Sequence, residues 1–148
     1  MALSPDQLVG LELANGKKKG VDLAEGLFLV GGELRPYTVA TVSTTDNTDT
    51  TAASITLADG DVVLVVARVM AKRTNSSDRA TYIRRALFYR DGGGAVRQGN
   101  VDTILTRESS AQWDVDLDTS GNDARVRVKG AIGHDVDWTV RYETFTVT

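Results

Sequence analysis

The sequence predicts an all-β fold, an antiparallel β-sandwich of about eight strands with a jelly-roll-like arrangement. Three observations support this prediction. From Tyr37 onward the chain is rich in β-branched residues and threonine, turn residues recur at short intervals, and no segment has a convincing helical period. Chains of this kind usually form two packed antiparallel sheets. The pattern does not determine the order of the strands within the sheets.

Residues 1–36 differ from the rest and indicate an extended, partly helical N-terminal arm. Ser4-Pro5-Asp6-Gln7 is typical of a helix start, with Ser as the N-cap and Pro at the first helical position. Leu8 and Leu11 are expected on one side of this short helix, and a second apolar segment follows at Leu27-Phe28-Leu29-Val30. We therefore divide the chain into an attachment arm, 1–36, and a β-sandwich domain, 37–148.

The sequence predicts eight strands for the sandwich domain, and for one of them it also predicts the position within a sheet. They are expected near residues 37–45, 53–57, 61–73, 79–91, 101–109, 112–119, 124–130 and 136–147. The strand 61–73 is apolar on both faces from Val62 to Val66, which is typical of a strand in the middle of a sheet. Its second face then needs a cover, either the arm, another sheet or another subunit.

The last strand changes its apolar side. Phe145 and Val147 follow on the side that is polar from Asp137 to Glu143. A β-bulge near Glu143-Thr144, burial of both sides, or a contact with another subunit would each explain the change.

Two adjacent segments carry complementary charges on alternate residues. If the chain turns at Gly121-Asn122, three acidic side chains lie opposite three basic ones across a hairpin, with a type II′ turn that requires glycine at its first central position. This charge ladder consists of Asp114, Asp116 and Asp118 opposite Lys129, Arg127 and Arg125, respectively.

The same aspartates also match the D-x-D-x-D spacing of a calcium loop. The glycine that such a loop needs after the third acid is Thr119 here, so we prefer the structural charge ladder and predict no metal site.

Composition excludes several other sites. The chain has no cysteine and a single histidine, His134, which excludes thiol chemistry and any site with two imidazoles. The formal net charge is −3, and no apolar stretch approaches the roughly 20 residues of a membrane span. We therefore expect neither nucleic acid nor membrane as a partner.

The sequence also lacks the marks of a catalytic site. No nucleophile motif or carboxylate in an apolar setting is visible, and Trp113 and Trp138 lie on apolar strand faces, where core positions are expected. We predict that the protein is not an enzyme and has no cofactor.

Several segments between Val62 and Val147 carry a resemblance to known proteins. They are Val65-Val66-Ala67-Arg68-Val69 with Arg73-Thr74, Tyr82-Ile83-Arg84 to Tyr89-Arg90, Ala111-Gln112-Trp113-Asp114-Val115, Asn122 to Gly130, and Gly133 with Asp137-Trp138-Thr139-Val140. This pattern resembles a β-sandwich module of virion proteins from tailed bacteriophages and prophages. The resemblance implies a structural protein of the phage particle surface, with other virion proteins (major capsid or tail proteins) as partners and a homotrimer as the favoured oligomer. It implies no catalytic or ligand-binding residue.

Among virion roles, we expect a capsid decoration or cement protein, because the sequence has neither the repeats nor the heptads of a long fibre. In this interpretation the arm attaches the protein to the particle. The expected attachment or oligomer contacts are Leu8, Leu11, Leu27, Phe28, Leu29 and Phe145. The alternative is a tail or fibre component that acts as a receptor-binding or carbohydrate-binding module, through an exposed aromatic platform or through the loops Asp46–Thr51 and Asp91–Gly94.

Overall fold

The computed structural model describes residues 27–30 and 33–148. Its contacts divide the chain into two units, Met1–Pro36 and Tyr37–Thr148. In the first unit, strand β1 (Leu27–Val30) pairs with β2 (Glu33–Pro36) in an antiparallel hairpin. The helix expected around Leu8 and Leu11 lies outside the described residues.

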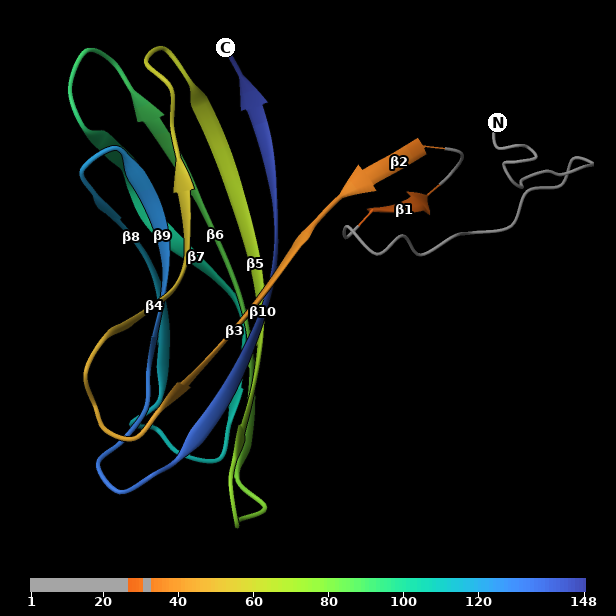
Figure 1. Cartoon of the computed structure of the whole chain (residues 1–148), viewed down its shortest axis with the longest axis vertical. Helices are drawn as coiled ribbons and strands as arrows, with labels where there is room; N and C mark the ends of the chain where they lie inside the picture. Colours follow the sequence, from red (N-terminus) through yellow and green to blue (C-terminus); the bar gives the residue numbers. More distant parts are fainter. Residues whose placement is uncertain (1–26, 31–32) are drawn as a thin grey trace, which may run out of the picture. The chain divides into compact units, whose positions relative to one another are not determined.

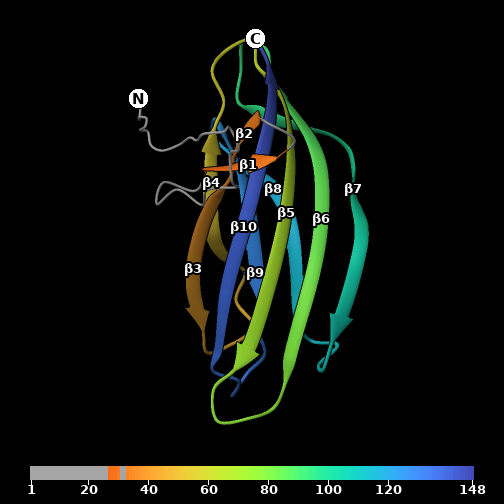
Figure 2. The ribbon, with the colours of Figure 1, turned by 90° about the vertical axis from the view of Figure 1, so that its right-hand side faces the viewer.

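The second unit consists of eight strands in two antiparallel sheets, shown in Figures 1 and 2. The larger sheet has the order β3-β10-β5-β6-β7, and the smaller has the order β4-β9-β8. The strands are β3 (Thr38–Thr44), β4 (Thr50–Thr56), β5 (Val62–Arg73), β6 (Arg79–Arg90), β7 (Ala95–Glu108), β8 (Asp114–Ser120), β9 (Asp123–Lys129) and β10 (Val136–Val147). This confirms the prediction of an all-β, antiparallel, two-sheet fold for the described part of the chain. The described residues contain no helix that is long and apolar enough to span a membrane.

The two sheets bury their facing sides in one core. The largest fully buried side chains come from both sheets and from the connections between them, as expected when two amphipathic sheets pack face to face. Trp113 and Trp138 are only 2% and 1% exposed, and their rings meet edge to face at 5.9 Å. The prediction that both tryptophans belong to the core is therefore confirmed. The indole Nε1 of Trp138 also donates a hydrogen bond to Thr44 Oγ1 at 2.9 Å, so its polar atom is satisfied.

Strand β5 lies in the middle of the larger sheet, as its two apolar faces predict. Its pairing with β10 is continuous from Val136 opposite Arg73 to Val147 opposite Val62. The β-bulge that we considered near Glu143-Thr144 is therefore absent. Phe145 and Val147 instead lie on the outer face of the sheet, 52% and 71% exposed. An exposed apolar patch results, because Val62 is their neighbour on β5.

Two arginines of the larger sheet close the free edge of the smaller one. Arg84 on β6 is only 5% exposed, and its Nε donates to the backbone oxygen of Val115 at 3.0 Å. Arg97 on β7 repeats the arrangement two residues further along β8, where its Nη1 donates to the backbone oxygen of Leu117 at 2.6 Å. Since β8 is an edge strand, these carbonyls have no neighbouring strand to bond with. The arginines supply the missing donors and join the two layers.

Candidate functional site

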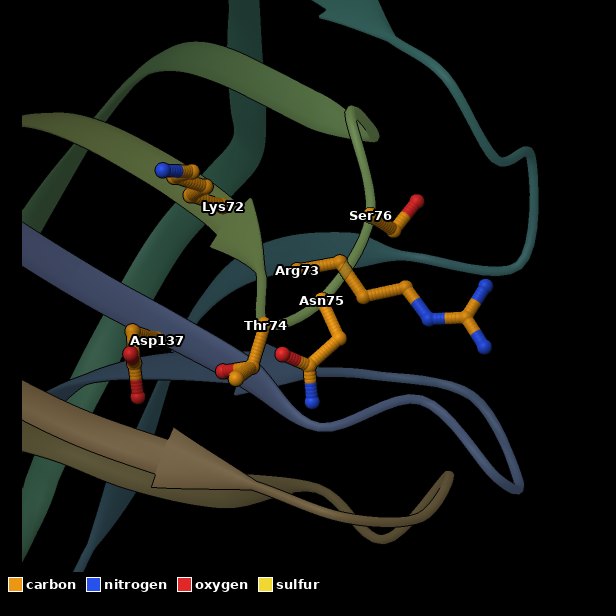
Figure 3. A pocket seen from close by; sticks show the side chains of 6 residues that line it. All are labelled: Lys72, Arg73, Thr74, Asn75, Ser76 and Asp137. Atoms are coloured by element: carbon orange, nitrogen blue, oxygen red, sulfur yellow. The ribbon is translucent and has the colours of Figure 1, made fainter.

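A polar hollow of about 340 Å³ lies at one end of the sandwich, between the β5–β6 turn and the start of β10 (Figure 3). It is lined by Lys72, Arg73, Thr74, Asn75, Ser76 and Asp137. The turn and Asp137 are far apart in sequence and are brought together because β5 and β10 are adjacent, with Lys72 directly opposite Asp137. In Figure 3 the Arg73 guanidinium extends away from Lys72 and Asp137.

The β5–β6 turn is held in shape by its own hydrogen bonds. The backbone N–H groups of Arg73 and Thr74 donate to the backbone oxygens of Asp78 and Asp135 at 2.9 and 2.8 Å. Arg73 also forms an ion pair with Asp78 at 3.2 Å and donates to the backbone oxygen of Gly133. Asn75 has a φ of 61°, a conformation that asparagine tolerates better than most residues. The wall of the hollow is therefore well defined.

Several polar groups that line the hollow have no partner among the described residues. Asp137 Oδ1 accepts a hydrogen bond from the Ser43 hydroxyl at 2.6 Å. By contrast, the side chains of Lys72, Thr74 and Asn75 form no hydrogen bond or ion pair with any other described residue. The hollow thus presents an ammonium, a hydroxyl, an amide and a carboxylate to a ligand from outside.

A second hollow, of about 400 Å³, lies further across the larger sheet. Met70, which is 62% exposed, gives it an apolar surface, and two arginines border it. Its lining consists of Met70, Arg79, Ala80, Thr81, Arg107, Glu108 and Ser109. Glu108 Oε2 accepts a hydrogen bond from the buried Tyr82 hydroxyl at 2.7 Å. Burial, followed by this contact with Glu108, raises the pKa of Tyr82.

The acidic side chains of the charge ladder form ion pairs both within the β8–β9 hairpin and with arginines of the larger sheet. In the structure β8 and β9 pair with Asp118 opposite Arg125, Asp116 opposite Arg127, and Asp114 opposite Lys129. Asp118 binds both neighbouring arginines: its two carboxylate oxygens accept from Arg125 at 2.9 and 2.8 Å, and Oδ2 also accepts from Arg127 at 3.0 Å. The hydrogen bond with Asp118 raises the pKa of Arg125.

The other two aspartates of the ladder pair with arginines of the larger sheet. Asp114 lies 3.8 Å from Arg84 and Asp116 lies 3.9 Å from Arg97. These are the arginines that close the edge of β8, and each binds a carbonyl and the carboxylate of the preceding residue. No ion pair is formed by Lys129 within the described residues. The register expected for the charge ladder is present, and Asp118 binds the base directly opposite it. The expected pairing is wrong for Asp114 and Asp116, because arginines of the facing sheet bind these carboxylates.

A small hollow of about 120 Å³ lies over the ladder and is lined by Asp49, Asp114, Asp116, Asp118, Arg127 and Lys129. Two cationic side chains share it with the carboxylates. Among the residues that the structure describes, no group of three or more His, Asp or Glu side chains is placed to hold a metal ion.

The expected attachment residues fall in different parts of the chain. Leu8 and Leu11 lie outside the described residues. Leu27, Phe28 and Leu29 belong to β1 of the hairpin, and Phe145 lies on the outer face of β10. Their role in attachment stays a prediction.

The loops considered for the alternative function are both held by internal hydrogen bonds. Asp46 Oδ1 accepts from the N–H of Thr48 at 2.8 Å, and the N–H of Gly92 donates to Asp59 Oδ1 at 2.6 Å. His134 accepts a hydrogen bond at Nδ1 from Trp113 Nε1 at 3.2 Å. None of these groups faces the hollow of Figure 3 as a lining residue.

Sequence reasoning did not identify the residues of the polar hollow. The sequence pattern marks Asp137 only as a polar position on a strand and gives no reason to connect it with Asn75 and Ser76. Clustered polar residues after a long strand were the available indication. Their proximity to Asp137 depends on the β5–β10 pairing, which the sequence pattern does not reveal.

Three solved structures that are similar to parts of this chain are phage tailspike proteins, each at low identity. The tailspike of Acinetobacter baumannii phage AM24 is 9% identical, with a TM-score of 0.44 over 74% of this chain and 26% of that chain. The tailspike gp49 of Acinetobacter baumannii bacteriophage Fri1, described as a capsular polysaccharide depolymerase, is 10% identical, with a TM-score of 0.42 over 84% of this chain and 19% of that chain. The tailspike of Acinetobacter phage vB_ApiP_P1 is 11% identical, with a TM-score of 0.33 over 93% and 24%.

This chain thus spans about a quarter or less of the length of these tailspikes. No protein-family model and no curated protein matches the sequence.

These comparisons correct one expectation. The prediction that the protein is not an enzyme is contradicted by the Fri1 tailspike, which is described as a depolymerase, and we withdraw it. The expected role in capsid decoration depends on an arm whose residues 1–26 lie outside the described residues, and it stays a prediction.

Proposed function

We propose that this chain is a tail or fibre component of a bacteriophage particle and that it binds polysaccharide in the polar hollow beside the β5–β6 turn. The observation that carries the proposal is a set of polar side chains in this hollow that form no hydrogen bond with any described residue. They are Lys72, Thr74 and Asn75. Polar groups that converge in a hollow and lack internal partners are typical of a binding site. The placement in a phage particle is supported by the sequence resemblance to virion sandwiches.

The chemistry of the hollow suits sugar hydroxyl groups. A hydroxyl both donates and accepts, and the hollow offers donors at Lys72 and Asn75 with acceptors at Asn75 and Asp137. Its volume of about 340 Å³ falls within the range of small-molecule sites, roughly 300–1,000 Å³. Capsular polysaccharide is the substrate class named for the Fri1 tailspike, and polysaccharide is the ligand class that we propose for this chain.

The proposal is tested by measuring the binding of the full chain to a panel of purified bacterial capsular polysaccharides. Asn75→Gly keeps the positive φ of the turn and removes only the side chain, while Asp137→Asn removes the charge at nearly constant shape. We expect each change to weaken binding about fivefold or more, because each removes at least one hydrogen bond to the ligand.

Asn47→Gly in the β3–β4 loop and Asp91→Asn after β6 test the two alternative loops, since both residues are exposed and neither lines the hollow. The release of reducing ends is followed in the same samples, so that cleavage is distinguished from binding. Absence of binding to every polysaccharide, or binding that neither Asn75→Gly nor Asp137→Asn weakens, would contradict the proposal.

A further inference from the structure

Three exposed cations form a row on the outer face of the larger sheet, next to the polar hollow. Lys72 on β5 lies directly opposite Arg79 on β6. Arg107 on β7 lies directly opposite Thr81, which is two residues from Arg79 on the same face. All three side chains are exposed, and they occupy three adjacent strands.

None of the three cations has a carboxylate partner among the residues that the structure describes. Arg79 Nη1 donates to the backbone oxygen of Ser77 at 2.8 Å and Arg107 Nη1 to that of Thr106 at 2.9 Å, which leaves the other guanidinium N–H groups of both side chains free. Within the described part of the chain, no carboxylate lies in ion-pair distance of Lys72, Arg79 or Arg107. Most other arginines of the sandwich do have such a partner: Arg68, Arg73, Arg84, Arg85, Arg97, Arg125 and Arg127.

The Lys72–Arg79 pair within this row is unfavourable by itself, and a bound anion would relieve the repulsion. Like charges that are directly opposite across two strands destabilise a sheet, and Lys72 and Arg79 are in this position. Asp137 lies opposite Lys72 on β10 and Glu108 follows Arg107 on β7, but neither carboxylate forms an ion pair with the row among the described residues. An anionic group between the two cations would replace the repulsion by two attractive contacts.

The row also connects the two hollows of this face. Lys72 borders the polar hollow of Figure 3, and Arg79 and Arg107 border the second hollow, whose apolar surface is Met70. From Asp137 on β10 to Arg107 on β7 the surface crosses four adjacent strands, which is roughly 14 Å. It can therefore contact several units of an extended ligand.

We infer that this surface recognises an acidic polysaccharide, whose carboxylates bind the row Lys72, Arg79 and Arg107 and whose sugar rings contact Met70. The inference rests on the proposed polysaccharide-binding function and adds the charge of the ligand. Nucleic acid is the competing polyanion. It fits less well, because three cations are few for phosphate binding and neither tryptophan is exposed for base stacking.

The test compares three probes on the full chain by titration calorimetry: alginate oligomers as a polyuronate, dextran oligomers of equal length as a neutral glycan, and a short DNA duplex. We expect alginate to bind at least about tenfold more tightly than dextran, and more weakly at 200 than at 50 mM salt. Arg79→Gln and Arg107→Gln should each weaken alginate binding about tenfold and leave dextran binding unchanged.

The matched control is Arg68→Gln, which removes an arginine from the same face of β5, four residues and roughly 13 Å from Lys72. It should not change alginate binding. Thermal unfolding of each variant verifies that the sandwich is intact.

Each other result is decisive. Equal binding of alginate and dextran, or alginate binding that both variants leave unchanged, overturns the acidic preference. The proposed function then still stands if Asn75→Gly weakens the binding of both glycans. Binding of the DNA duplex as tight as that of alginate, with the same losses in the variants, identifies a general polyanion surface and overturns the inference. If neither glycan binds, both the inference and the proposed function fail.

Discussion

Replacing Arg84 by methionine should destabilise the sandwich by about 3 kcal/mol. Arg84 is buried and supplies hydrogen bonds to the backbone oxygens of Val115 at 3.0 Å and Leu105 at 2.8 Å. A hydrogen bond from a charged donor contributes roughly 1.5–3 kcal/mol, so the two together contribute about 3–6 kcal/mol. Part of this is offset, because methionine fills similar space without the cost of burying a charge.

The ion pair with Asp114 should contribute much less to stability than the two carbonyl contacts. The Asp114 side chain is 63% exposed and lies 3.8 Å from Arg84 Nη2, so the pair is close to the exposed pairs that are worth roughly 0–1 kcal/mol. We therefore expect Asp114→Asn to cost less than about 1 kcal/mol. The comparison of the two variants separates the carbonyl contacts from the ion pair.

The assay is urea unfolding of wild type, Arg84→Met and Asp114→Asn, followed by tryptophan fluorescence and circular dichroism at pH 7. A loss of about 3 kcal/mol corresponds to a fall in Tm of about 12 °C for a domain of this size. The slope of the free energy of unfolding with urea should not change, because the same surface is exposed. A cost below about 1 kcal/mol for Arg84→Met, or equal costs for the two variants, would refute the reasoning that Arg84 stabilises the sandwich mainly through the backbone carbonyls of Val115 in the facing sheet and Leu105 in its own sheet.

Three further predictions concern stability and assembly. Burial raises the pKa of Tyr82 in the folded protein, whereas an unfolded tyrosine has a pKa of about 10, so the stability that Tyr82 contributes is lost as the pH rises above about 10. Tyr82→Phe should therefore reduce the alkaline loss of stability by up to about 1.4 kcal/mol per pH unit. An equal loss of stability above about pH 10 in both proteins would count against this. Gly130→Ala would place a Cβ atom 2.5 Å from Thr44 Oγ1, which accepts the hydrogen bond from Trp138. We expect it to lower the free energy of unfolding by about 1–3 kcal/mol and to shift the tryptophan emission. The control Gly93→Ala, whose Cβ would meet nothing within 4 Å, should be nearly neutral. The exposed apolar patch of Phe145, Val147 and Val62 is the surface through which a homotrimer would form. Phe145→Glu should then reduce the mass in light scattering to that of a monomer, whereas Ile132→Glu at an exposed loop position should not. A monomeric mass of the wild type would contradict the prediction.

What the sequence by itself determined is mainly local. Alternation of apolar and polar residues identified the strands, because side chains of a strand point to opposite faces in turn. The two-sided apolar stretch Val62–Val66 placed its strand in the middle of a sheet. The two tryptophans were assigned to the core from their strand faces, and Gly121, with a φ of 57°, was assigned to the tight turn between β8 and β9. Each of these inferences depends on neighbouring residues only.

What only the tertiary structure decided are the contacts between segments distant in sequence. Asp114 and Asp116 lie beside Arg84 and Arg97 because the free edge of β8 lies against the larger sheet. The polar hollow and the cation row likewise exist only because β10, β5, β6 and β7 are neighbours in one sheet. A charge pattern within one hairpin indicates which side chains share a face, but ion pairs and binding hollows depend on which strands are adjacent. Adjacency of strands that are distant in sequence is set by the packing of the whole core, and residue periodicity alone does not reveal it.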